Sequence, residues 1–355
     1  MNIRWRHFHS MGNMMGLFLV SLLWRGGMLA HATDRPLIEA HYVMGTIFQI
    51  TLYTPDRETG QRAMRAAFEE IRRIDAKMSN YKPESELSRM NRTAWKRPFH
   101  ASDELYAIIR ESISYAELTE GAFDVTVAPL LKLWGFYKHE GHFPTARELE
   151  HVRARVGYTF LILDEEEKTI SFAKPGVEID LGGIAKGYAI DRAVEILRRY
   201  GITSALLSAG ESTIYALGAP PGKTFWSVSL RDPKHPQKMM AVLRLRDQSV
   251  STSGRYEKFF RLSGKMYGHI FDPRTGQPVQ GIYSVTIVAP RAIQSDALST
   301  SVFVLGFERG MALLNRLDEV MGLIVGEGDN GEEYHIEQSE GFDRVLEKMF
   351  PHHPD

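Results

Sequence analysis

The residues with the clearest chemical pattern lie in the stretch 179–188, where an apolar run ends in Asp180 and a glycine turn leads into a helix that carries Lys186. Glycine lets a backbone approach a ligand closely, the N-terminus of a helix attracts anions, and lysine adds positive charge. Proteins hold phosphate groups with this combination. Taken alone, the stretch is explained more simply as a tight strand-to-helix turn with a solvated lysine.

Two distant segments add hard oxygen atoms and a base. Asp296 and Thr300 are spaced one helical turn apart, so both side chains lie on one helix face, and a carboxylate with a hydroxyl suits Mg²⁺. Capping of that helix by Ser295 and Asp296 is the simpler explanation. His269 precedes the turn 272–276, and an imidazole can accept a proton from a hydroxyl, although a lone histidine is more often structural. Together these segments suggest chemistry on a phosphoanhydride.

Aromatic and apolar residues could line a pocket for a planar ligand. Tyr81 follows a predicted helix and precedes Pro83, so its ring could stack on a base, with Met44 supplying apolar contact. A half-buried loop tyrosine is the more common case. Asp124 lies in the apolar, strand-like run 121–129 and needs a partner if it is buried, which either backbone or a ligand could supply.

The elements that must position these residues follow from hydrophobic periodicity and capping. Alternation predicts a strand over 46–53, and apolar spacing predicts a helix over 60–78, followed by a loop with Pro83 and Asn91. Ser102 caps a helix that ends at Gly121. Further predictions are a capping box at Thr145 and Glu148, a hairpin of 160–163 with 169–172, a helix from 186 to 201, a helix starting at Asp296, and strands around Gly210 and over 226–230, 241–245, 248–252, 282–289 and 321–325. The irregular interleaving predicts an α+β fold with mostly antiparallel sheets and packed helices.

Composition excludes several classes of protein. The net charge of −1 over 355 residues does not favour a nucleic-acid partner, and the absence of cysteine excludes disulfides, thiolate sites and a lipoprotein anchor. Residues 1–32 have a basic start, an apolar core over 14–24 and a small-residue pattern at 30–32, which predicts a secretory signal peptide and a periplasmic domain over 33–355. An uncleaved anchor, with inner-membrane association, is the alternative.

Seven segments, in order along nearly all of this chain after the signal, resemble the ApbE-type FAD:protein FMN transferases. They are Met44-Gly45-Thr46, the segment 78–88 around Tyr81, 121–126, 180–188, 251–254, 269–276 and 295–300. No single segment is decisive, but seven in order are specific. The chain departs from the family at 208–211, where many members have a Gly-Gly pair, and in lacking the cysteine of the lipoprotein members.

The resemblance implies the flavin-transferase fold, with FAD as substrate and Mg²⁺ at its diphosphate. It implies that Mg²⁺ is held by the Gly183 carbonyl, Asp296 and Thr300, and that His269 is the general base. The implied FAD-binding residues are Met44, Tyr81, Ala122, Phe123, Asp124, Asp180, Lys186 and Ile270.

The implied reaction transfers FMN from FAD to a Thr or Ser hydroxyl of an acceptor protein, forms a phosphoester bond and releases AMP. The expected acceptors are membrane-bound redox subunits with a short flavinylation motif. Two alternatives remain open at this stage. One is a Mg²⁺-dependent FAD diphosphatase that releases FMN and AMP, and the other is a non-catalytic periplasmic FAD-binding protein.

Overall fold

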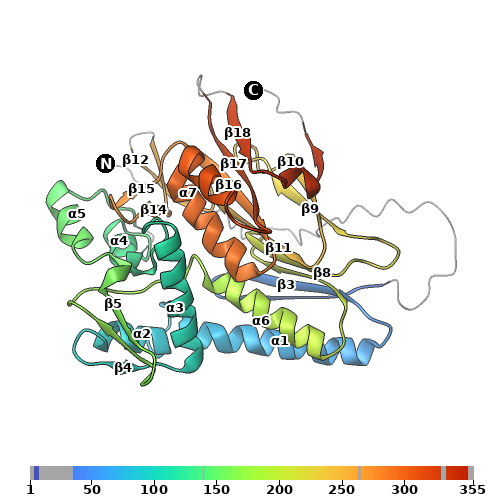
Figure 1. Ribbon diagram of the computed structural model, residues 1–355, viewed down its shortest axis with the longest axis horizontal. Coiled ribbons are helices and arrows are strands. Elements are labelled where there is room, and N and C mark those ends of the chain that lie inside the picture. Colours follow the sequence, from blue (N-terminus) through green and yellow to red (C-terminus); the bar gives the residue numbers. More distant parts are fainter. Residues whose placement is uncertain (1–3, 8–34, 139, 263–264, 329–332, 351–355) are drawn as a thin grey trace.

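A large antiparallel sheet forms the centre of the computed structural model, which describes residues 4–7, 35–138, 140–262, 265–328 and 333–350 (Figure 1). Its eight strands follow the order β18-β17-β16-β11-β8-β7-β3-β2. In chain order they are β2 (Leu37–Val43), β3 (Thr46–Tyr53), β7 (Ser204–Ala209), β8 (Thr213–Leu217), β11 (Gln248–Gly254), β16 (Ile282–Ala289), β17 (Met321–Glu327) and β18 (Tyr334–Gln338).

Both faces of this sheet are covered, and the strand residues alternate between the two layers. Three long helices pack on one face: α1 (Arg57–Met78), α6 (Ala185–Arg199) and α7 (Ala292–Leu314). The other face packs against a small sheet of β9 (Trp226–Arg231), β10 (Met239–Leu245) and β19 (Leu346–Met349). Strands β8 and β16 are buried throughout, because they lie between these two layers.

A second group of short elements lies beside the main sheet (Figure 1). It contains α2 (Glu86–Thr93), α3 (Asp103–Leu118), α4 (Ala128–Leu133) and α5 (Ala146–Arg153), with the sheet of β4 (Phe99–His100), β5 (Leu161–Asp164) and β6 (Thr169–Phe172). An aromatic cluster around Trp134 joins α4 to the hairpin of β12 (Lys258–Leu262) and β13 (Lys265–Gly268) and to β14 (Phe271–Asp272), which pairs with β15 (Gln277–Pro278). Strand β1 (Arg4–His7) pairs with β12.

Most of the local predictions are confirmed. The strand over 46–53 is β3, α1 extends the helix predicted over 60–78, and the predicted capping box of Thr145 and Glu148 is present. Ser102 caps α3 through its side chain. All the strand pairs of the described residues are antiparallel, which agrees with the predicted α+β class.

Three local predictions are wrong. The strand-like run 121–129 forms a 3-10 helix (Val125–Val127) followed by α4, because the Asp124 side chain caps the first and Pro129 stands in the first turn of the second. The predicted loop around Asn91 contains helix α2, which Ser85 caps. Helix α7 starts at Ala292, one turn before Asp296, so Asp296 does not cap it.

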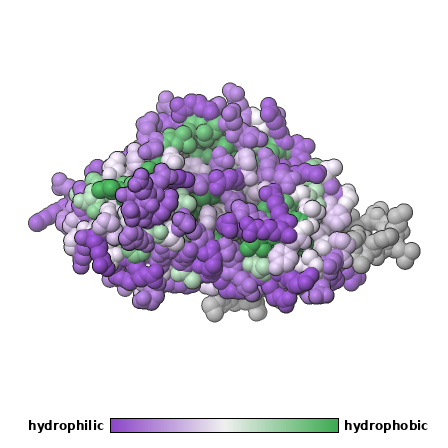
Figure 2. All heavy atoms as spheres, turned by 60° about the horizontal axis from the view of Figure 1, so that its bottom comes forward, coloured by the Kyte–Doolittle hydropathy of each residue, from purple (hydrophilic) through white to green (hydrophobic). Residues whose placement is uncertain are grey.

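Helix α7 is the one helix of the described residues that is long and apolar enough to cross a membrane. Its most apolar window is 61% buried within the fold, and its side chains contribute to the core under β16 and β17. It is therefore the central helix of the domain. The face of the molecule that Figure 2 brings forward is largely hydrophilic, with apolar residues in separate patches. Apart from Arg4–His7, the predicted signal peptide lies outside the described residues.

Candidate functional site

Met44 lies in a two-residue turn between β2 and β3. Met44 and Gly45 both have positive φ angles, 52° and 74°, and Val43 pairs with Thr46 on either side of them. This is the turn type that suits the twist of a hairpin, but a methionine in the left-handed region is strained. Such strain often marks a functional site, which agrees with the predicted role of Met44 beside a ligand.

An aromatic pair and a hydrogen-bonded carboxylate form one side of the site. The ring of Tyr81, which is 64% exposed, stacks on Tyr137 with centroids 5.3 Å apart. The Tyr137 hydroxyl and the Asn80 side-chain amide both donate to Asp180 Oδ2. Asp180 Oδ1 accepts from the Gly182 N–H at 2.6 Å. The structure therefore brings the predicted residues Tyr81 and Asp180 together through Tyr137 and Asn80.

The segment Ala122-Phe123-Asp124 supplies the floor beside the glycine turn. A methyl group added to Gly183 would lie 3.3 Å from the Phe123 ring and 3.4 Å from Thr300 Oγ1, so these three residues are in contact. Asp124 is buried, and its carboxylate accepts from the Thr126 and Tyr158 N–H groups, both at 2.7 Å. The partner of Asp124 in this structure is therefore backbone.

Helices α6 and α7 cross closely and cap one another. Asp191 of α6 accepts hydrogen bonds from the Ala292 and Ile293 N–H groups at the start of α7, at 2.7 and 3.0 Å. In return, Asp296 Oδ2 accepts from the Gly187 N–H at the start of α6, at 2.9 Å. Each carboxylate stabilises unpaired N–H groups and the positive end of the other helix's dipole.

Asp296 and its surroundings fit a divalent cation. The carboxylate is buried, and within the described residues its Oδ1 accepts one hydrogen bond, of 3.3 Å, from the Thr213 hydroxyl. Burial raises the pKa of Asp296, although the positive charge of Lys186 opposes this shift. A bound cation would stabilise this buried charge. Thr300 lies one turn further along α7 next to Gly183, and Asp296 accepts from Gly187, so a carboxylate and a hydroxyl of α7 both face the segment 183–187. These are hard oxygen donors of the kind that Mg²⁺ prefers.

The predicted Mg²⁺ ligands, Gly183, Asp296 and Thr300, include a single carboxylate. In line with this, no three His, Asp or Glu side chains gather into a metal-binding group anywhere in the described ranges.

Lys186 stands at the start of α6, and its Nζ donates to Ser212 Oγ at 2.6 Å. Ser212 belongs to the turn between β7 and β8, where Gly210 and Glu211 have positive φ angles. A side chain at Gly210 would meet Thr46 Oγ1 at 2.0 Å, so this turn packs directly against the hairpin that carries Met44. The segment that departs from the family pattern thus packs against this hairpin through Gly210.

His269 follows β13, and its geometry determines which nitrogen can act as a base. The His269 backbone N–H donates to the Lys258 carbonyl at 3.1 Å, and the ring Nδ1 lies 3.2 Å from the same oxygen. A carbonyl can only accept, so the neutral ring carries its proton on Nδ1 and keeps a lone pair on Nε2. Burial, together with the charges of Lys258 and Lys186, lowers the pKa of His269 to about 3. The imidazole ring is therefore uncharged at neutral pH, with its one proton on Nδ1.

Comparisons with known proteins identify the family of the chain. The sequence model described as the ApbE family matches residues 44–324. The chain belongs to the ApbE family. The chain is 32% identical to the FAD:protein FMN transferase of Treponema pallidum over 88% of its length and 90% of that protein. It is 34% identical to the one of Haemophilus influenzae, over 78% and 81% of the two chains.

Solved ApbE structures share the fold. The crystal structure of the ApbE protein from Thermotoga maritima matches with a TM-score of 0.79 at 32% identity, covering 88% of this chain and all of that one. The flavin transferase ApbE from Vibrio cholerae matches with a TM-score of 0.77 at 30% identity, covering 88% and 99%. These matches confirm the predicted family and the predicted fold.

Three residues of this ApbE-family site were not predicted from the sequence. Tyr137 stacks on Tyr81, and Asn80 and Asn91 both donate to the Ile179 carbonyl before the glycine turn. Asn80 stood inside a matching segment, but nothing in the sequence marks Tyr137 or Asn91, because Asp180 lies 43 residues from Tyr137 and Ile179 lies 88 residues from Asn91.

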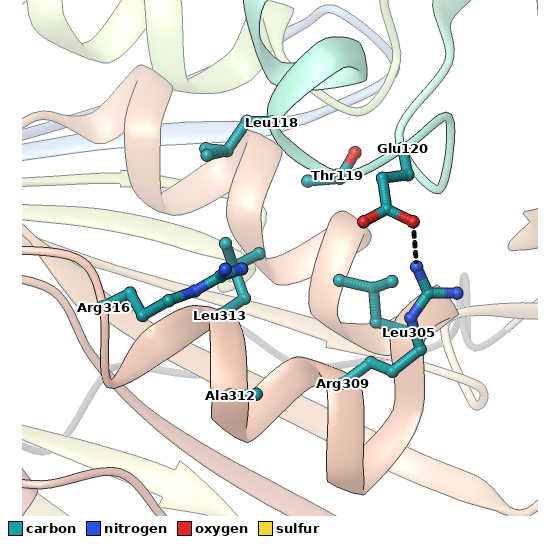
Figure 3. Close-up of a pocket in the computed structure, with 8 residues that line it drawn as sticks. All are labelled: Leu118, Thr119, Glu120, Leu305, Arg309, Ala312, Leu313 and Arg316. Carbon is teal, nitrogen blue, oxygen red and sulfur yellow. Dashed lines mark hydrogen bonds and ion pairs between the residues drawn. The ribbon is translucent and has the colours of Figure 1, made fainter.

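Two surface cavities lie away from these residues. One, of about 200 Å³, lies between the end of α3 and the second half of α7, where Arg309 pairs with Glu120 at 2.6 Å over leucine side chains (Figure 3). The other, of about 780 Å³, lies on α2 and β4 and is lined by Arg89, Arg92 and Arg97 among others. Neither contains a predicted site residue, so the site rests on the converging side chains described above.

Proposed function

We propose that this ApbE-family enzyme, an FAD:protein FMN transferase by its family and its relatives, uses Mg²⁺ to transfer FMN from FAD to a Thr or Ser hydroxyl of an acceptor protein. The observation that carries the proposal is the position of Asp296 and Thr300 of α7 against the segment 183–187, which also carries Lys186, together with an uncharged His269 whose Nε2 is not held by the Lys258 carbonyl. A phosphate-binding turn, hard oxygen donors and a base are the parts that transfer of a phosphoryl-type group requires.

The side chains divide between binding the flavin and binding the diphosphate. The exposed ring of Tyr81, supported by Tyr137, offers a stacking surface for the flavin nucleotide. Lys186 can exchange its Ser212 partner for a phosphate oxygen. Gly183, Asp296 and Thr300 would hold Mg²⁺, which when bound would neutralise charge that develops on the diphosphate oxygens.

His269 moves the proton. The acceptor hydroxyl attacks the FMN-side phosphorus, a new P–O bond forms, and the P–O bond to AMP breaks so that AMP leaves with the electron pair. His269 Nε2 accepts the hydroxyl proton, since Nδ1 is held by the Lys258 carbonyl. The Lys258 carbonyl thus orients the ring, and Lys186 stabilises the charge that moves toward the leaving group.

We further propose that the enzyme acts in the periplasm on a redox protein of the inner membrane. The basic start, apolar core and small-residue end of residues 1–32 support export. Absence of cysteine supports a mature protein without a lipid anchor.

Incubation of the full chain with FAD, Mg²⁺ and a threonine-containing acceptor tests the proposal. We expect an acceptor mass increased by one FMN, AMP in equal amount, and no product when EDTA replaces Mg²⁺. Free FMN with an unmodified acceptor would instead indicate an FAD diphosphatase, and unchanged FAD would indicate a binding protein. Transfer that continues in EDTA would contradict the role of Mg²⁺.

A further inference from the structure

The hairpin of β2 and β3, which carries Met44 at its turn, presents one face to the helices and the other to solvent. Leu37 and Val43 of β2 lie in the core that α1 covers, and the centroids of the His41 ring and the Phe68 ring of that helix are 4.0 Å apart. Side chains alternate along a strand, so the residues between them point to the opposite face. On that face the register pairs Ile38 with Thr51, Ala40 with Gln49, and Tyr42 with Ile47.

The solvent-facing side of this hairpin is exposed and uncharged. Ile38, Tyr42 and Ile47 are 58%, 73% and 58% exposed, and the other three residues of the face are neutral. The small sheet of β9, β10 and β19 packs on the middle of the main sheet and meets β3 at Tyr53, at the end remote from Met44. Exposed apolar residues that gather in one place mark interaction sites more often than single ones do.

β2 is also the outermost strand of the main sheet. The two-residue turn at Met44 makes its flanking pair, Val43 and Thr46, a hydrogen-bonded pair, and such pairs alternate with unbonded ones along an antiparallel ladder. In agreement, the Ile47 carbonyl points away from β2 and accepts from the Gly210 N–H at 2.8 Å. The backbone groups of β2 that point to the open edge are therefore those of Ile38, Ala40 and Tyr42.

The two edges of the main sheet differ in their protection. Long, regular edge strands invite pairing with another chain, and proteins commonly block them with charges or bulges. β18, at the other edge, carries His335 and Glu337, whose side chains are 2.7 Å apart. β2 instead runs for seven residues in regular register with β3, and its charged residues, Glu39 and His41, lie on the face toward α1. β2 is thus the edge at which a further strand can add.

We propose that β2 is the docking edge for the acceptor protein. An extended segment of the acceptor, with apolar side chains at alternate positions, pairs with β2 as a further strand and brings its Thr or Ser hydroxyl to the site. The inference rests on the proposed function, because it assigns a place on this enzyme to the second substrate of that reaction. Backbone bonds to Ile38, Ala40 and Tyr42 hold the segment, and the apolar face beside them receives its side chains.

Two arguments select the acceptor over other occupants of this edge. β2 continues directly into the strained turn at Met44, so a segment that pairs with Tyr42 passes next to the predicted flavin pocket. An FAD:protein FMN transferase must also hold a polypeptide, and pairing through backbone groups holds an extended polypeptide of almost any sequence. Contacts with Ile38 and Tyr42 then favour segments that have apolar residues at alternate positions.

Transfer kinetics separate docking of the acceptor from the chemistry. Ala40→Pro removes an N–H that points to the open edge and leaves the bonds to β3 in place, and Ile38→Lys puts a charge on the apolar face. Each variant should raise the KM for a threonine-containing acceptor protein about tenfold, whereas kcat and the KM for FAD stay as in the parent enzyme. Ile38→Val, which keeps an apolar side chain, should retain the KM of the parent for the acceptor.

The matched control is Ile162→Lys. Ile162 is also an exposed isoleucine, at 55%, and its strand β5 is the edge of a different sheet. This control should leave the KM for the acceptor unchanged. An unchanged KM in Ile38→Lys, or an equal rise in Ile162→Lys, would overturn the proposal even if Ala40→Pro fails to fold.

Amide hydrogen exchange locates the docking without turnover. The probe is a peptide that spans the candidate threonine of the acceptor, with valine in place of that threonine. The amides of Ile38, Ala40 and Tyr42 should exchange quickly in the free enzyme, and saturating peptide should slow all three. Unchanged exchange of these amides in the presence of the peptide would overturn the proposal.

The other occupants give different results in the same experiment. Protection that appears without peptide and grows with enzyme concentration would assign the edge to a second copy of the chain. Protection by phosphatidylglycerol vesicles but not by peptide would assign it to a membrane surface, and either result would overturn the proposal. If the parent enzyme releases free FMN and leaves the acceptor unmodified, the proposed function fails, whereas the exchange of the β2 amides still shows whether the edge binds the peptide.

Discussion

Two charged clusters in this molecule are built on opposite principles. Between α1, α3 and α6, Glu104 accepts from Arg73 at 2.6 Å, pairs with Lys77 at 2.8 Å and accepts from the Tyr188 hydroxyl at 2.8 Å. Arg73 also pairs with Glu70 at 2.7 Å. Every charge in this network has an opposite partner supplied by the chain itself, and the network joins three helices.

In the candidate site, by contrast, burial and the charges of Lys258 and Lys186 keep His269 uncharged, and the buried Asp296 carboxylate has hydrogen-bond donors but no ion pair within the described residues. The first cluster is complete without a ligand, and under the proposed function the second is completed by a diphosphate and a Mg²⁺ ion. Unsatisfied charge in a folded protein thus distinguishes a binding site from a structural network, even when both are equally polar.

The largest effect should follow from removing the single predicted metal carboxylate. Asp296→Asn keeps an oxygen that can accept from the Gly187 N–H, so the cap of α6 remains while the charge is lost. We expect FMN transfer to fall by roughly 100-fold or more at saturating Mg²⁺, with a folded protein by circular dichroism. Undiminished transfer that still requires Mg²⁺ would exclude Asp296 as a ligand.

Removal of the base should cost slightly less. His269→Ala should reduce kcat by roughly 100-fold while FAD still binds, because the ring acts on the acceptor proton rather than on the flavin. Rapid-quench measurement of transfer, with FAD binding followed by flavin fluorescence, checks both parts. If FAD binding disappears together with transfer, His269 is a wall of the pocket and not the base.

The helix network should respond to acid. Burial of the Glu104 carboxyl group tends to raise its pKa. Hydrogen bonds from Arg73, Lys77 and Tyr188 outweigh this effect and lower the pKa to about 2, below its ordinary value of 4.5. A lowered pKa stabilises the fold above the unfolded-state value, and this stabilisation is lost as pH falls from about 4.5 to 2. Glu104→Gln should lower the free energy of unfolding at pH 7 by about 1–3 kcal/mol and flatten its dependence on acid, as measured by urea unfolding.

Much of the fold could be predicted from the sequence, because its signals are local. Apolar and polar residues alternate along strand β3. Helices α3 and α5 each follow a Ser or Thr whose side chain accepts from the backbone N–H three residues later. The run 121–129 is the exception, because the apolar pattern outweighed two local helix signals. Asp124 caps the 3-10 helix through the Thr126 N–H and Pro129 stands in the first turn of α4, while the contact of Asp124 with Tyr158, 34 residues away, is not visible in the sequence.

The candidate site was predictable through resemblance more than through chemistry. Isolated motifs at Asp180, His269 and Asp296 each had a simpler explanation, and only their order along the chain pointed to one enzyme. Capping did turn out to be a role of Asp296, but of α6 and not of its own helix. Rules that consider one helix at a time cannot find such a contact, since it depends on how two helices cross.

The carboxylates that α6 and α7 present to each other's first turn also give the protein an internal probe of the proposed metal site. The Gly187 amide hydrogen points at Asp296 Oδ2, so withdrawal of electron density from that oxygen by an ion must change the amide's chemical shift and its rate of exchange with solvent. The Gly187 amide resonance can therefore report the binding of an ion at Asp296, with no flavin or turnover required.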